Sequence, residues 1–390
     1  MQRRSFIRVW GGGVICAAVP VAVSQAVAQS MPADAPWSGP PADVADVRRW
    51  ALAHAILAPN PHNLQPWLVD LREPNTITSH CDGQRLLPHT DPYGRQILIG
   101  HGCFIELLVL ALAQKGYRAE VALFTQGLPG RELADLSLHP VARITIHSGA
   151  SADSLFEQIG RRHTPKVDFD RQRPVGAAAL QTLLAVSTHA DVHVAASTET
   201  PRVQALRDLC LAAARVEVET ERTMMESMRL LRVGPDEINQ HRDGISNNSW
   251  KARFAVATGL FDRSQFPKPG STVHRETMAR YQGQCQSAMG FVWVTTPDNR
   301  RMTQIQAGRE FVRLQLAGAQ LGLGVHPMSQ SLQEFPEMRP HYEQVHRLLL
   351  GRAAPRDASE PTVQMLCRLG YPAETVEPTP RRPLGAFLTH

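Results

Sequence analysis

A loop rich in proline and amide side chains constrains the fold of this chain most strongly. From Pro59 to Trp67 the sequence reads Pro-Asn-Pro-His-Asn-Leu-Gln-Pro-Trp. Proline fixes its own φ at about −65° and disfavours the α conformation in the residue before it, so the loop is predicted to be rigid. Residues 44–56 have the apolar spacing of a helix, and residues 67–71 are typical of a short strand. The sequence therefore predicts a rigid crossing from a helix to a strand.

The side chains of this loop favour one kind of ligand. Two asparagines and one glutamine each offer amide donors and acceptors, and the loop ends in an indole. Such a set suits a flat heterocycle whose edge alternates N–H, C=O and ring nitrogen. A proline-rich turn that ends in a buried tryptophan is the plainer interpretation, and the composition of the loop leaves both open.

The first 28 residues are predicted to be a twin-arginine export signal. Adjacent arginines at Arg3 and Arg4 precede an apolar run over residues 9–23, and Ala26-Val27-Ala28 is a small-residue cleavage site. An N-terminal membrane anchor is the alternative, but the run is short and glycine-rich for a spanning helix. We therefore expect a periplasmic or otherwise exported protein that keeps no stable membrane anchor after cleavage.

Charge and cysteine content exclude several classes of function. The formal charge is +5, and setting aside Arg3, Arg4 and Arg8 leaves +2, which is too little to indicate a nucleic-acid partner. The 43% hydrophobic and 20% charged residues are typical of a globular chain. Six cysteines occur without CxxC spacing, so no metal site is predicted. Most are expected to be small buried residues, and one disulfide pair stays open.

The remaining chain is predicted to contain two α+β halves. After a linker at residues 29–42, they span residues 43–150 and 151–390. Each holds one long apolar helix stopped by glycine, the first from Arg95 to Lys115 and the second opening at 306–309 and ending near 320–324. Internal duplication explains this pattern, although two core helices can also look alike by chance.

A polar, glycine- and proline-rich insertion at about 234–275 interrupts the second half. It has no counterpart in the first half and is predicted to be a lid. Its aromatic residues Trp250, Phe254 and Phe261 are expected to be buried against the rest of the site.

Several motifs together resemble the nitroreductase family. The segment Pro59 to Trp67 resembles the loop that lies along the isoalloxazine of FMN in that family. Residues 161–166, Arg-Arg-His-Thr-Pro-Lys, resemble the segment that holds the FMN phosphate. Leu-Gly-Tyr-Pro at 369–372 and Arg-Arg-Pro at 381–383 resemble the closing strand and the basic tail. Residues 321–324 resemble the Gly-Leu-Gly turn whose backbone approaches flavin N5.

The resemblance implies a nitroreductase-like fold with two pseudo-symmetric halves, as in the Acg-like branch, where two halves are fused. The first half carries the amide loop and the second carries the basic motifs, which implies one composite FMN site per chain. The chain would then act as a monomeric pseudo-dimer, with further oligomerisation open. The residues implied in binding FMN are Pro59, Asn60, Asn63, Gln65, Arg162, His163, Thr164, Lys166, Gly322, Gly324, Arg381 and Arg382.

The expected activity is that of an FMN-dependent oxidoreductase that passes hydride or electrons through flavin N5 to a small organic acceptor. The electron donor, NAD(P)H or another reductant, stays open. Because the flavin carries the chemistry, no catalytic acid or base is assigned, and His62 and His326 are weak candidates as proton donors. The first alternative is an exported protein that sequesters FMN with little or no turnover. The second is a partner-binding module without flavin, which would be colourless.

Overall fold

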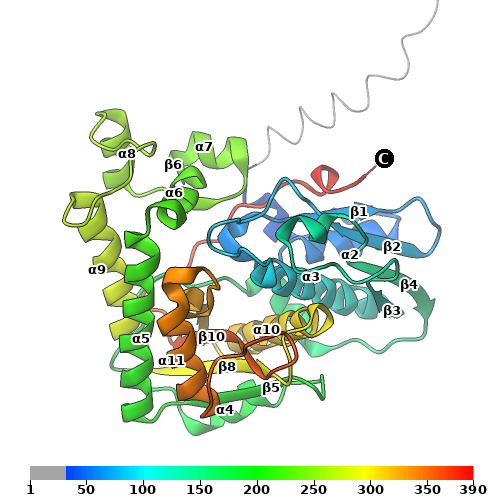
Figure 1. Cartoon of the computed structure of the whole chain (residues 1–390). Helices are drawn as coiled ribbons and strands as arrows, with labels where there is room; N and C mark the ends of the chain where they lie inside the picture. Colours follow the sequence, from blue (N-terminus) through cyan, green and yellow to red (C-terminus); the bar gives the residue numbers. More distant parts are fainter. Residues whose placement is uncertain (1–31, 390) are drawn as a thin grey trace, which may run out of the picture. The chain divides into compact units, whose positions relative to one another are not determined.

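Two four-stranded sheets, each accompanied by one long helix, organise the chain (Figure 1). The computed structural model describes residues 32–389, so the predicted export signal lies outside the described residues. From Ala33 onward the chain forms one compact unit. The strands of the first sheet are β1 (Trp67–Asp70), β2 (Thr76–Cys81), β3 (Tyr117–Leu123) and β4 (Ala142–Ser148). Those of the second are β5 (His193–Ser197), β8 (Gly290–Thr296), β9 (Gly324–Pro327) and β10 (Thr362–Gly370).

The two sheets share one topology. Their strand orders are β1-β2-β4-β3 and β5-β8-β10-β9, which in both cases means first, second, fourth and third, and all pairs are antiparallel. A helix of 20 residues joins the second and third strands of each sheet, α3 (Arg95–Gln114) in the first and α10 (Arg301–Gln320) in the second. This confirms the predicted α+β fold with two pseudo-symmetric halves.

The start of α10 differs from the sequence-based expectation. The helix begins at Arg301 and not at 306–309. The first turns of α10 carry polar residues, including Gln304 and Gln306, so they lack the apolar spacing by which a helix is predicted from sequence. With the correct start, Arg95 and Gly102 in α3 correspond to Arg301 and Gly308 in α10, seven residues apart in both helices.

The long helices cross at their glycines. A Cβ atom at Gly102 would lie 2.0 Å from the carbonyl oxygen of Ile305, and one at Gly308 would lie 2.0 Å from that of Ile99. The contact is therefore reciprocal, as the pseudo-symmetry requires. Only a residue without a Cβ atom allows the two backbones to approach so closely.

The first residues of α3 and α10 tie each half to the other. Arg95 Nη2 donates to the carbonyl of Leu332 at 2.5 Å, across to the second half. Arg301 Nη1 donates to the carbonyl of Tyr93 at 2.6 Å, across to the first half. Each arginine thus bonds to the opposite half, so the symmetry of the helix crossing is also present at the starts of the two helices.

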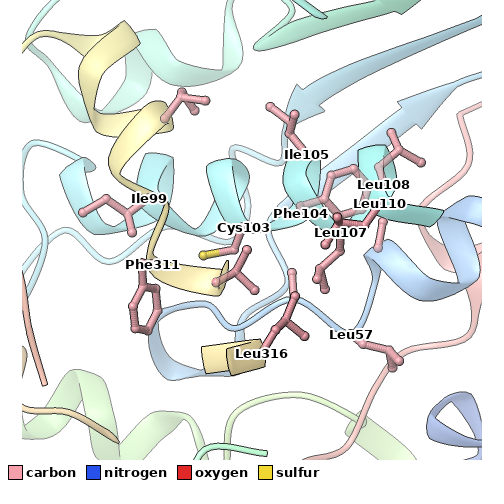
Figure 2. Packing of buried hydrophobic residues seen from close by; sticks show 14 of the residues in the cluster. Leu57, Ile99, Cys103, Phe104, Ile105, Leu107, Leu108, Leu110, Phe311 and Leu316 are labelled. Carbon is pink, nitrogen blue, oxygen red and sulfur yellow. The ribbon is translucent and has the colours of Figure 1, made fainter. Parts of the chain in front are cut away.

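Helix α3 runs through the main hydrophobic core (Figure 2). Cys103, Phe104 and Leu107 are fully buried there. Among the described residues α3 is the one helix long and apolar enough to cross a membrane, but 83% of its most apolar window is buried inside the protein, as in a core helix. The five cysteines among residues 32–389 are all free and buried, so the open disulfide pair does not form.

Shorter elements surround these two layers. Thr220, whose backbone is extended, separates α5 (Thr200–Glu219) from α6 (Glu221–Arg229). The other helices are α2 (Val47–Ala55), α4 (Ala177–Leu184), α7 (Gly234–His241), α8 (Trp250–Ala257), α9 (Thr272–Gln286) and α11 (Arg339–Leu350). A parallel pair joins β6 (Leu231–Val233) to β7 (Ile245–Asn247). Short 3-10 helices are η1 (Ala35–Ser38), η2 (Pro61–Asn63), η3 (Leu133–Ser137), η4 (Ser154–Arg161), η5 (Ser329–Leu332), η6 (Pro336–Met338) and η7 (Leu384–Ala386).

The aromatic residues of the insertion are not buried as expected. Trp250 and Phe254, on α8, are 72% and 57% exposed. They lie one helical turn apart on the outer face, so the packing that the sequence suggested is absent for both. Phe261 is partly buried and packs against a methionine-rich cluster that includes Met224 and Met228.

Candidate functional site

One cavity of about 770 Å³ lies where the predicted binding motifs meet. This size falls within the range of about 300–1,000 Å³ that is usual for cofactor and small-molecule sites. The cavity is lined by the amide loop, the basic segment after η4, the insertion, α9, the residues around η5 and the C-terminal tail. Of the predicted cofactor-binding residues, the lining includes Pro59, Asn60, Asn63, Thr164, Lys166 and Arg381. Outside it lie Gln65, Arg162, His163, Gly322, Gly324 and Arg382.

The amide loop holds a strained backbone conformation. His62, Asn63 and Gln65 have φ values of 50°, 53° and 54°, in the left-handed region that residues with a side chain rarely adopt. Each such residue costs roughly 1–3 kcal/mol, and strain of this kind concentrates at ligand sites. The loop therefore needs strong local support to keep this shape.

The loop's own amides provide much of that support. The Asn60 Oδ1 atom accepts a hydrogen bond from the backbone N–H of Gln65 at 2.7 Å. The Asn63 side chain donates to the carbonyl of Pro380 at 3.0 Å and accepts from Arg381 at 2.7 Å. These amides, which the sequence suggested for a heterocycle edge, are thus largely occupied in holding the loop to the C-terminal tail.

Gln65 joins three separate parts of the chain. Its side chain is fully buried and donates to the carbonyls of Asn63 and Arg242, the latter at 2.8 Å. Its Oε1 atom accepts from the backbone N–H of Arg382 at 2.9 Å. Gln65 therefore positions the loop against the insertion and the tail, without reaching the cavity.

Two buried arginines clamp the loop: Arg381 lines the cavity, and Arg162 lies behind its wall. Arg162 and Arg381 are 1% and 2% exposed, and both donate through Nη2 to the carbonyl of Leu57, at 2.7 and 3.0 Å. Both guanidinium groups also lie over the ring of Trp37, at 5.5 and 5.0 Å from its centre. The Nε atom of each is buried and has no hydrogen-bond partner among residues 32–389.

The charge around these arginines is not neutralised. Neither one forms an ion pair with a carboxylate in the described part of the chain, and each lowers the pKa of a neighbouring cation. Lys166 lines the cavity, and its ammonium has no hydrogen-bond or ion-pair partner within residues 32–389. Lys166 is exposed to the cavity, and desolvation by the surrounding walls, with the charges of Arg280 and Arg381, lowers its pKa to about 8. Burying Arg162 and Arg381 without a counter-charge, with the ammonium of Lys166 in the adjoining cavity, is costly, so the cluster fits an anionic ligand.

Both candidate histidines line the cavity and are neutral at pH 7. Burial, with a smaller effect of Lys166, lowers the pKa of His62 to about 4, and its Nε2 lies 2.8 Å from the Ser227 hydroxyl. Burial also lowers the pKa of His326 well below its usual range, and Arg368 Nε donates to its Nδ1 at 2.8 Å. A guanidinium can only donate, so His326 carries its proton on Nε2. Each ring can take part in hydrogen bonds, but neither offers an imidazolium proton near neutral pH.

The two predicted glycines have structural roles. Gly322 adopts φ 64° after the end of α10, where a left-handed residue ends the helix. A Cβ atom at Gly324 would lie 2.8 Å from the Pro165 side chain and 2.7 Å from the Phe169 ring. Gly324 therefore lets the segment that carries Thr164 and Lys166 pack against β9.

No family model matches the sequence. The chain is 25% identical over 352 residues to "Putative NAD(P)H nitroreductase acg" of Mycobacterium tuberculosis (strain H37Rv), a match that covers 87% of this chain and 94% of the relative. A second protein of that strain, "Putative NAD(P)H nitroreductase Rv3131", is 22% identical over 358 residues, which cover 87% and 90%.

This chain resembles nitroreductases over most of its length. Among solved structures, the FMN- and NADPH-dependent nitroreductase NfnB from a Sphingopyxis strain aligns with 61% of this chain and 99% of its own, at 18% identity and a TM-score of 0.35. Oxidised iodotyrosine deiodinase bound to FMN and 3-iodo-L-tyrosine aligns with 59% and 95%, at 14% identity and a TM-score of 0.34.

Several residues around the cavity were not found from the sequence. Trp37, in the expected linker, packs on both buried arginines and donates through Nε1 to the carbonyl of Thr379 at 2.7 Å. The only sequence signal was a lone aromatic in a proline- and alanine-rich segment. Glu217 and Tyr281 also line the cavity, from α5 and α9, and nothing in the sequence distinguished them from other helix residues. Among residues 32–389, no group of three His, Cys, Asp or Glu side chains could hold a metal ion.

Proposed function

We propose that the chain is an FMN-dependent oxidoreductase of the nitroreductase type, which transfers hydride or electrons from a reduced donor to a small organic acceptor. The observation that carries the proposal is the unneutralised cationic cluster beside a strained amide loop, both bordering one cavity. The M. tuberculosis relatives named NAD(P)H nitroreductases support it. When bound, FMN supplies the redox chemistry, and the protein supplies orientation and electrostatics.

The residues present fit the two parts of FMN. Lys166, Thr164 and the buried charge of Arg162 and Arg381 would hold the phosphate, since a dianion suits a group of cations and hydroxyls. Residues 59–63 and 326–329 border the same cavity and would flank the flavin ring. His326, with its proton on Nε2, would offer that ring a hydrogen-bond donor.

Purified protein is expected to be yellow and to contain one FMN per chain. The amide loop and the basic motifs occur once each, and the structure brings them to one cavity. Acid extraction followed by absorbance measurement should give close to one equivalent. Two equivalents would require a second site elsewhere in the chain, and a colourless protein that takes up no added FMN would refute the proposed function.

FMN affinity is expected to fall as the pH rises above about 8. Lys166 has a pKa of about 8, so it is mostly charged below that pH and loses its proton above it. The decline is expected to be up to about tenfold per pH unit, because one pKa unit corresponds to about 1.4 kcal/mol. Affinity should also weaken below pH 6, where the phosphate gains a proton. Equilibrium FMN titrations of apo-protein at a series of pH values measure both effects. An affinity that stays constant above pH 8 would exclude Lys166 from phosphate binding.

A sequestering protein with little turnover is the second candidate function. It is favoured by the insertion, which contributes cavity-lining residues on β7 and α8 and after α8, such as Ile245, Ala252 and Phe261. Such a cover restricts access to the flavin. Stopped-flow mixing with NADPH separates the two candidates, because an oxidoreductase that uses this donor bleaches the flavin absorbance rapidly.

The location of the protein is proposed from the sequence of residues 1–28. We propose export by the twin-arginine route, which carries folded proteins and so suits a chain that acquires its cofactor in the cytoplasm. NAD(P)H is a cytoplasmic reductant, so another donor would serve an exported enzyme. Fractionation of expressing cells, with a variant in which Arg3 and Arg4 are replaced by lysine, tests this location.

A further inference from the structure

A second group of polar side chains lines the cavity, apart from the residues assigned to FMN. Glu217 on α5, Tyr281 on α9, and Gln330 and Gln333 from η5 and just after it contribute to the lining. Glu217 and Gln333 are 6% and 5% exposed. Nothing in the proposed FMN site uses these four side chains.

Two hydrogen-bond acceptors of this group are unused, whereas its amide nitrogens have partners. Gln333 Nε2 donates to the Glu217 carboxylate at 2.9 Å. Because an ionised carboxylate only accepts, this bond fixes the Gln333 amide and leaves its Oε1 atom unused. The Oε1 atoms of Gln333 and Gln330 are both buried and have no partner among residues 32–389.

The charge of Glu217 points to the same kind of ligand. Glu217 forms no ion pair within residues 32–389. Burial raises its pKa to about 7, so the group is about half ionised at neutral pH; the Gln333 amide and Arg280 lower the pKa, and the nearby charge of Glu226 raises it. A bound ammonium would favour the ionised form. A buried carboxylate without a bonded cation is costly, and a positively charged donor in the cavity would relieve that cost.

Apolar side chains line the cavity beside this polar group. Val218, Met224 and Met228 line the same cavity and belong to one buried cluster. Methionine side chains adapt to flat or irregular partners and make favourable contacts with aromatic rings. The neighbourhood therefore suits a ligand with a donor group at one end and an aromatic or apolar body.

We propose that Glu217, Gln330 and Gln333 form a substrate subsite that binds a protonated amine attached to an aromatic electron acceptor. This inference rests on the proposed function, since it names the class of acceptor that the flavin would reduce. It assigns to α5 and η5 the choice of substrate, separately from the residues that hold FMN.

Binding of a matched pair of probes to the FMN-loaded protein tests the subsite. The probes are para-nitrobenzylamine, which is protonated at neutral pH, and para-nitrobenzyl alcohol, which has the same body and no charge. Isothermal titration calorimetry on the oxidised protein should show the amine binding about tenfold or more tightly, as expected for a charge-assisted hydrogen bond. Equal affinities would overturn the proposal.

Substitution of the carboxylate tests the assignment. In Glu217→Gln the preference for the amine should disappear, while the bond from Gln333 can be kept by the new amide oxygen. Glu276→Gln is the matched control, because Glu276 also lines the cavity but lies on the exposed face of α9. That variant should keep the preference. A Glu217→Gln protein that still prefers the amine, or a Glu276→Gln protein that loses the preference equally, would refute the subsite.

Flavin content and melting temperature, measured on the same samples, distinguish a loss of the subsite from a loss of FMN or of the fold. A Glu217→Gln protein with full FMN content and an unchanged melting temperature has lost only the subsite. Absence of FMN from the unmodified protein would instead refute the proposed function. Probe binding uses no turnover, so it remains informative if the electron donor is not NADPH.

Discussion

Lys166→Met is expected to lower FMN affinity about 10- to 100-fold, with the fold unchanged. A charge-assisted hydrogen bond contributes about 1.5–3 kcal/mol, and losing it produces a change of this size. The Lys166 side chain has no partner among residues 32–389, so removing its charge breaks no contact that supports the structure. Methionine keeps a similar length without the ammonium. The measurement is an FMN titration of apo-protein, followed by flavin fluorescence.

Lys251→Met provides the matched control. Lys251 also lines the cavity and is exposed like Lys166, but it lies on α8 in the insertion and not in the basic segment 161–166. If the phosphate binds at the basic segment, this variant should bind FMN nearly as well as the unmodified protein. Equal losses in both variants would mean that the cavity attracts FMN through its general positive field, and the assignment of Lys166 would fail.

The lysine gives a sharper test than the arginines that the sequence motifs emphasised. Arg162 donates to Leu57 and, at 3.0 Å, to Gln315 Oε1, and Arg381 donates to several acceptors that include Asn63 and Thr379. Replacing either one would leave buried acceptors unpaired, at a cost of about 1–3 kcal/mol each. Loss of FMN from such variants would therefore mix cofactor binding with loosening of the loop.

The sequence located the segments that border the cavity because its motifs are local. Residues 59–67, 161–166 and 381–383 are short segments whose composition is unusual, and each one borders or supports the cavity. Their spatial meeting was inferred from the resemblance. What composition could not show is which side chain turns into the cavity: Asn60 and Lys166 line it, whereas Gln65 and Arg162 face the supporting structure.

The residues that the sequence missed depend on contacts between distant segments. Glu217 accepts a hydrogen bond from Gln333, which lies 116 positions away. Trp37 packs against arginines of the second half. The start of α10 was missed for a different reason, since its first turns carry buried polar residues such as Gln304. Gln304 donates to the backbone of Asn299, so its burial is satisfied by a partner that apolar spacing does not reveal.

Gly102→Ala and Gly308→Ala are each expected to cause a large loss of stability. Each new Cβ atom would lie 2.0 Å from a backbone carbonyl oxygen of the opposite helix. Backbone atoms cannot rotate away as side chains do, so α3 and α10 would have to separate. Overpacking commonly costs about 1–3 kcal/mol and occasionally more, and here we expect about 3 kcal/mol or more. Thermal unfolding should show a melting temperature lower by about 5 °C or more.

Gly283→Ala is the control for the helical glycine itself. Gly283 lies inside α9, where a Cβ atom would meet the carboxylate of Asp168 at 2.9 Å, the end of an exposed side chain that can move. Alanine favours the helix by about 1 kcal/mol over glycine, so this variant should stay within about 1 kcal/mol of the unmodified protein. Equal melting temperatures for Gly102→Ala and Gly283→Ala would show that the crossing is not as close as described.

The same crossing links stability to cofactor binding. Ile99 and Cys103 on α3, and Phe311 on α10, line the cavity close to the two glycines. Helices forced apart at Gly102 and Gly308 would move these residues, so both variants should also release FMN more readily. Because the contacts are reciprocal, the two single variants should be affected about equally. A loss of stability in only one of them would contradict the pseudo-symmetric packing of the two halves.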